Sequence, residues 1–145
     1  MDHLHRKTDA NRRLLVLRAA FWMGAVLDAA MLPPMLVPSI GGAMFGIADF
    51  QPGSEYRYAM YVGASLMAGW TALLVWADRK PVERRNVILL TLFPVMAGLI
   101  GASIYAASSG LVTPEGILPI FILQISLTVF FLGAYIISRP QARSS

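Results

Sequence analysis

Four long apolar runs, separated by short polar segments, dominate the hydrophobic pattern of the chain. They cover about residues 14–37, 57–77, 87–108 and 117–138. A helix needs about 20 apolar residues to cross the hydrocarbon core of a bilayer, and each run is long enough. Because a backbone in lipid must satisfy its own hydrogen bonds, the runs predict an all-α fold, an antiparallel bundle of four transmembrane helices. They leave no room for a soluble domain, so residues 1–145 are predicted to form a single membrane domain.

The segments between the runs differ in character. Residues 39–50 are apolar and small but too few to span, which predicts an interfacial or re-entrant segment. Residues 78–85 are short and basic, which is typical of a tight turn between two antiparallel helices. Asp78, at the start of this turn, is a candidate cap for the third helix.

Proline and capping residues predict where the helices begin, bend and end. Asp9 is a candidate N-cap for the first helix, and Thr113 is one for the fourth, with Pro114 in its first turn. The adjacent Pro33 and Pro34 are expected to end or kink the first helix. Pro94 lies inside the third run, where it predicts a kink.

Small residues recur at helical spacing in three runs and predict faces along which neighbouring helices pack closely. In the first run the face is Ala20, Gly24 and Asp28 with Ala25 beside it; in the second it is Ala64, Ala68 and Ala72; in the third it is Gly98 and Ala102 with Ala97 and Gly101. All three faces are expected to turn inward.

Composition places the chain in a membrane, and charge suggests its orientation. Hydrophobic residues make up 57% of the sequence and charged ones 14%, with a mean hydropathy of +0.61, which is typical of an integral membrane protein. Of the 12 Lys and Arg residues, only Arg57 falls on the side opposite the termini. Basic residues near helix ends stay in the cytoplasm, so both termini are predicted to be cytoplasmic. Arg18 is expected to reach back to the lipid headgroups.

Several chemistries are excluded by what the sequence contains. These charges follow the membrane ends without interleaved aromatic residues, so they indicate contact with membrane lipids rather than nucleic acid. The chain has no cysteine, and its two histidines are His3 and His5. Two histidines near a terminus do not make a metal site, so no metal is assigned and no cofactor can be named.

Asp28 is the residue that most needs an explanation, because a carboxyl in a membrane span costs about 2.5–3.5 kcal/mol and marks a candidate functional site. At helical rise Gln124 lies at a similar depth. Tyr61 and Tyr105 lie near it, with Ser103 close by and Arg57 at the rim, so the candidate ligand-binding residues are Asp28, Arg57, Tyr61, Tyr105 and Gln124. Two interpretations stay open: an ion pair between Asp28 and Arg57, or a pocket open to the outer face that takes a proton or a cationic or hydroxylated ligand.

These residues favour binding of a small apolar or amphipathic molecule of the lipid or quinone type, or service as an accessory subunit of a membrane complex. A homodimer or a membrane-complex partner is compatible with the small-residue faces. One alternative is an isomerase-like enzyme with Asp28 as acid or base, although no second acid is evident and no catalytic residue can be assigned. A small proton-coupled transporter is another.

The layout resembles the DoxX-like group of small bacterial four-helix membrane proteins. The resemblance rests on the first hairpin loop at residues 44–47 (MFGI), the entry to the second helix at 57–60 (RYAM), and residues 69–85 (GWTALLVWADRKPVERR), which end that helix in a basic turn. It covers most of the chain. It implies a four-helix bundle and an accessory or small-molecule-binding role, since some members are linked to quinone-dependent oxidases, and it supplies no catalytic residue.

Overall fold

The structure is a computed structural model that describes residues 2–47 and 49–139; of residues 2–9 and 114 it describes only the backbone. Its elements are α1 (Asp2–Leu36), α2 (Pro38–Met44), α3 (Ser54–Asp78), α4 (Asn86–Leu90), the π-helical segment η1 (Thr91–Met96), α5 (Ala97–Ser108) and α6 (Pro114–Ser138). Across these described ranges the regular structure is entirely helical, so the predicted fold class is confirmed.

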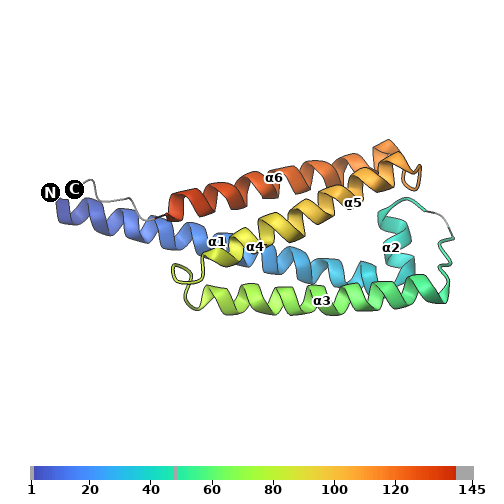
Figure 1. The fold of residues 1–145 in the computed structure, drawn as a ribbon, viewed down its shortest axis with the longest axis horizontal. Coiled ribbons are helices and arrows are strands. Elements are labelled where there is room, and N and C mark those ends of the chain that lie inside the picture. The colour runs from blue at the N-terminus through green and yellow to red at the C-terminus, as the bar shows by residue number, and fades with distance from the viewer. Residues whose placement is uncertain (1, 48, 140–145) are drawn as a thin grey trace.

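Four helical segments are long and apolar enough to cross a membrane, namely Ala10–Leu36 in α1, α3, the continuous stretch from α4 to α5, and residues 115–138 in α6. They run alternately up and down, and the start of α1 lies at the same end as the finish of α6 (Figure 1). Helix α1 is the central element: it packs along α3 on one side and against α6 on the other. Helix α3 packs almost entirely on α1.

The tightly packed core occupies only one half of the bundle, toward the ends of α3 and α6. Its largest fully buried side chains are Leu17 and Phe21 of α1, Leu74 of α3 and Ile88 of α4. Phe131 of α6 completes the contact from the other side. In the opposite half the helices are held less closely, and that half contains the cavity described below.

Only one of the three small-residue faces turns fully inward. Ala20 and Ala25 are buried in α1, whereas Ala68 of α3 and Gly98 of α5 are exposed. Helix α3 has one main neighbour, so it buries one narrow stripe and leaves Ala68 outside it. The π-helical turn adds a residue to the third span, which rotates the face of α5 away from the direction that an uninterrupted helix would give. The prediction that all three faces pack inward was therefore wrong.

Pro33 and Pro34 do not interrupt the first helix where they were predicted to, whereas Pro94 lies at an irregular turn, as predicted. Helix α1 continues through Pro33 and Pro34 as far as Leu36. It stops at Val37, whose φ of −117° and ψ of 102° are extended, because the next residue is Pro38 and a residue before proline avoids helical angles. Pro94 lies within η1, so its missing N–H is accommodated by a wider turn.

The predicted interfacial segment contains a short helix, α2, which lies across the end of the bundle (Figure 1). Its close approach depends on two buried glycines. A Cβ on Gly41 would lie 2.7 Å from the carbonyl oxygen of Pro34, and one on Gly42 would lie 2.6 Å from Cβ of Phe50. Neither position has room for a side chain, so the glycine pair lets α2 cover this end.

One of the three predicted caps is present. Thr113 is the N-cap of α6, and its Oγ1 accepts a hydrogen bond of 3.4 Å from the N–H of Gly116. Asp9 lies inside α1, which begins at Asp2, and Asp78 is the last residue of α3 rather than a cap of α4. The Asp9 and Asp78 capping predictions were wrong, because the first helix continues past its expected start and the Asp78 carboxyl is engaged elsewhere.

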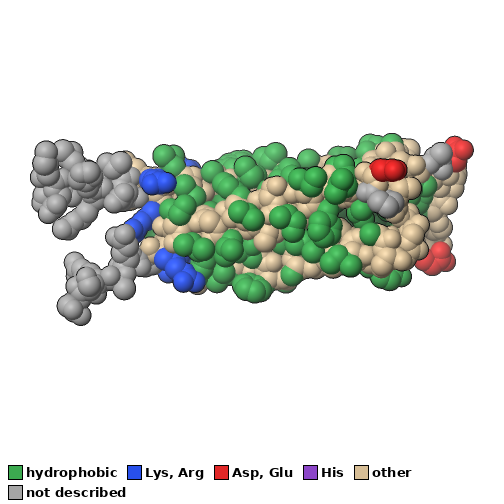
Figure 2. Space-filling view, turned by 90° about the horizontal axis from the view of Figure 1, so that it is seen from above, with side chains coloured by type: hydrophobic (Ala, Val, Ile, Leu, Met, Phe, Trp, Pro, Cys, Tyr) green, Lys and Arg blue, Asp and Glu red, His purple; other side chains and the backbone are tan. Residues whose placement is uncertain are grey.

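In the view of Figure 2, Lys and Arg side chains gather at one end of the bundle, and the Asp and Glu side chains visible there lie at the other end. The basic end contains the turn between α3 and α4, where Arg84 stacks over the Trp76 ring at 3.4 Å and Lys80 pairs with Glu83. The sides between the two ends are largely hydrophobic in this view. This is the distribution expected of a small multi-pass membrane protein.

Candidate functional site

A cavity of about 190 Å³ lies in the loosely packed half of the bundle. It is enclosed by α1, by η1 and the start of α5, and by α6, while Met67 reaches it from α3 and Met44 from α2. Its walls are mostly apolar: the polar side chains that line it are Asp28, Thr91 and Gln124.

Two of these three polar side chains are already satisfied within the protein. The Thr91 hydroxyl donates to the carbonyl oxygen of Val87 at 3.0 Å. Gln124 is buried and joins α6 to α5, because its Nε2 lies 3.0 Å from Oγ of Ser103 and its Oε1 accepts from that hydroxyl at 3.1 Å. Gln124 therefore holds two walls of the cavity together.

Asp28 is the exception. It is half-buried, and among the described residues no hydrogen bond or ion pair reaches its carboxyl group. It lies eight residues before the end of α1 at Leu36, or about 12 Å along the axis, so it stands well inside the candidate span. A carboxyl at such a depth is costly without a donor. Asp28 is therefore the group in this cavity that a ligand could satisfy.

The structure brings together two of the five predicted site residues, Asp28 and Gln124. Arg57, Tyr61 and Tyr105 do not line the cavity; all three are exposed, the two tyrosines by 52% and 69%. The ion pairs within the described part of the chain are Arg18–Asp78 and Lys80–Glu83, so the alternative of an Asp28–Arg57 pair is not formed.

Sequence reasoning missed the methionines that line the cavity. Met31 of α1, Met44 of α2, Met67 of α3 and Met96 of η1 each come from a different element. Methionine is unbranched and polarisable, so it adapts to ligands of irregular shape. The one sign of this lining in the sequence is the number of methionines, which is 8. Composition does not reveal that four of them converge on one cavity.

A second hollow, a groove of about 320 Å³, lies between α1, α3 and η1. It shares Asp28, Met67 and Val95 with the cavity. Trp70 of α3 also lines it, and the indole Nε1 of Trp70 is buried with no hydrogen-bond partner among the described residues. An unsatisfied buried donor costs about 1–3 kcal/mol.

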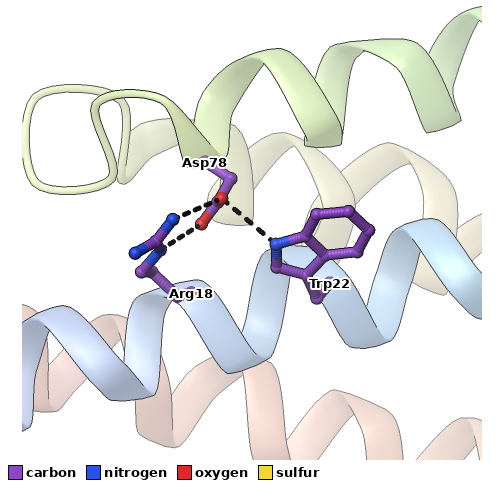
Figure 3. A network of polar contacts seen from close by, with 3 residues as sticks. All are labelled: Arg18, Trp22 and Asp78. Atoms are coloured by element: carbon purple, nitrogen blue, oxygen red, sulfur yellow. Dashed lines mark hydrogen bonds and ion pairs between the residues drawn. The ribbon is translucent and has the colours of Figure 1, made fainter.

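A polar network ties α1 to α3 on the tightly packed side (Figure 3). Arg18 Nε donates to Asp78 Oδ1 at 3.0 Å and its Nη2 donates to Oδ2 at 3.2 Å. The indole Nε1 of Trp22 donates to Asp78 Oδ2 at 3.1 Å. The Arg18 guanidinium is thus held by Asp78, and its reach toward the lipid headgroups stays a prediction. The sequence could have predicted this contact, because two antiparallel helices place residues 18 and 78 at the same depth and side by side.

Metal ligands do not gather in the described part of the chain: no group of three His, Asp or Glu side chains there is close enough to hold an ion. His3 and His5 fall among residues 2–9, whose side chains lie outside the described ones.

Fold and site together define a small, multi-pass helical membrane protein with a methionine-lined cavity beside one intramembrane carboxyl. No protein-family model, curated protein or solved structure matches the chain. The resemblance to the DoxX-like group therefore stays a prediction.

Proposed function

We propose that this protein binds a small amphipathic molecule in the cavity beside Asp28. The observation that supports the proposal is the pairing of apolar, adaptable walls with a single unpartnered carboxyl. An apolar body would fill the cavity and gain dispersion contacts, and a hydroxyl or another hydrogen-bond donor would satisfy Asp28. Asp28 is the one titratable side chain among the residues that line the cavity, which favours binding over acid–base chemistry by a pair of groups.

The size of the cavity sets the size of the molecule. A cavity of about 150 Å³ can hold benzene, whereas drug-sized ligands use about 300–1,000 Å³. At about 190 Å³, this cavity suits one ring or a short branched group.

Replacing Asp28 tests the proposal. Asp28→Leu should weaken saturable binding of 2-ethylphenol at least about tenfold, because a hydrogen bond to a charged group contributes about 1.5–3 kcal/mol. Binding is measured on the protein in phosphatidylcholine nanodiscs, with empty nanodiscs as the background. Thermal unfolding should show Asp28→Leu to be at least as stable as the parent, since an unpaired carboxyl has left the span.

The matched control is Glu55→Leu, which removes an exposed carboxyl at the start of α3, away from the cavity. Glu55→Leu should leave 2-ethylphenol binding unchanged. Equal binding by the parent and by Asp28→Leu would defeat the proposed function.

We also propose that the basic end faces the cytoplasm of a bacterial cell, with the protein in the inner membrane. The asymmetry of Lys and Arg supports this orientation. On this cysteine-free chain, Val82→Cys in the turn between α3 and α4 should be labelled from the cytoplasmic side, and Leu111→Cys in the turn before α6 from the other side. Labelling of both residues from one side would contradict the four-span topology.

A further inference from the structure

The groove between α3 and η1 suggests how a ligand reaches the cavity and what shape it has. Every residue that lines the groove lies within a candidate membrane span. Its outer rim includes Leu66, which is 70% exposed. Because α3 packs almost entirely on α1, no other described helix packs closely against this side. The groove therefore opens sideways, at the depth of the lipid chains.

The groove and the cavity lie next to each other and share part of their lining. Asp28, Met67 and Val95 line both, so these three side chains form the boundary between the two spaces. Apart from Asp28, the groove is lined by apolar side chains, by Gly63 and by the indole of Trp70. The unpartnered Asp28 carboxyl thus lies between two largely apolar hollows rather than at the far end of one.

Building on the proposed function, we propose that the ligand is a single-tailed amphiphile that enters from the lipid. Its ring or compact head occupies the cavity, its hydroxyl donates to Asp28 at the boundary, and its tail lies in the groove. The hydroxyl of such a molecule lies next to the point where the tail joins the head. The cavity alone, at about 190 Å³, has no room for a long tail, whereas the groove adds about 320 Å³.

Two glycines of α3 provide a matched test. A Cβ on Gly63 would meet only the flexible end of Met35, with Cε at 2.8 Å, so a leucine there fits by pushing Met35 into the groove. Gly69 lies on the same helix and lines neither hollow, and no atom of the described residues lies within 4 Å of a Cβ built on it. Leu66→Trp fills the rim of the groove and serves as a second variant.

The probes are 2-dodecylphenol, which has a tail beside its hydroxyl, and 2-ethylphenol, which has the same head without the tail. Affinities are measured in phosphatidylcholine nanodiscs and expressed relative to the probe concentration in the membrane. Gly63→Leu and Leu66→Trp should weaken binding of 2-dodecylphenol at least about tenfold through steric overlap with the tail. Both should leave 2-ethylphenol binding unchanged, and Gly69→Leu should change neither probe.

The outcomes separate this inference from the proposed function. If 2-ethylphenol binds in an Asp28-dependent way but filling the groove does not weaken 2-dodecylphenol binding, or weakens both probes equally, the groove does not hold the tail and this inference is overturned. If neither phenol binds the parent protein saturably, the proposed function fails as well.

Discussion

Gly24→Leu is expected to destabilise the protein by about 1–3 kcal/mol or more, because it overpacks the contact among three helices. A Cβ on Gly24 would lie 2.9 Å from Cδ1 of Leu74 and 3.4 Å from Cζ of Phe131. Both neighbours are almost fully buried, so neither can move aside at low cost. Unfolding in a detergent–denaturant titration would measure the loss.

Gly98→Leu is the matched control, since it makes the same change in another span. No atom of the described residues lies within 4 Å of a Cβ built on Gly98, so this variant should change stability by no more than about 0.5 kcal/mol. A loss at Gly98 as large as that at Gly24 would mean that the exposed face of α5 packs against something, such as a second copy of the chain.

The fold was predictable because a bilayer leaves few alternatives. Four apolar runs of sufficient length must be helices, and short turns make neighbours antiparallel. The direction in which each helix faces was not predictable in the same way. One extra residue in the π-helical turn at Pro94 rotates everything after it, and no periodicity in α5 reveals that rotation.

The sequence predicted how deep in the membrane the candidate site lies, but it did not predict which side chains at that depth face the cavity. Asp28 and Gln124 share the cavity, whereas Tyr61 and Tyr105 are at compatible depths and point away from it. On a helix each residue turns by about 100°, so two side chains at one depth can face opposite sides. The methionine walls were missed for another reason: an apolar side chain in an apolar run carries no signal.

Packing and site are connected through the division of the bundle into two halves. On one side of Gly24, large side chains such as Phe21 and Leu74 fill the space between helices. On the other side, Asp28 and the methionines leave a cavity. The closely packed half fixes the positions of α1 and α3, and the other half leaves space for the ligand that we propose, so a small bundle can combine stability with a binding cavity.

Asp78→Ala is therefore expected to reduce both stability and ligand binding. The Asp78 carboxyl holds Arg18 and Trp22, one turn apart on α1, to the end of α3 (Figure 3). Without the Asp78 carboxylate, the Arg18 and Trp22 donors of α1 lose their acceptor on α3, and α1 is freer to slide along α3. Asp28 is 10 residues from Arg18, about 15 Å along α1, so the register fixed by the network also sets the position of Asp28 beside the groove.

The appropriate control is Glu83→Ala, because Glu83 also belongs to an ion pair at the basic end. Its partner is Lys80, and both side chains are more than half exposed, at 67% and 57%. Such a pair contributes at most about 1 kcal/mol, so Glu83→Ala should be nearly neutral for unfolding and for 2-ethylphenol binding. In a double-mutant cycle of Asp78→Ala and Arg18→Ala, the double variant should lose less free energy of unfolding than the sum of the losses of the two single variants. Strictly additive losses, or equal effects of Asp78→Ala and Glu83→Ala, would show that the network does not fix the α1–α3 register.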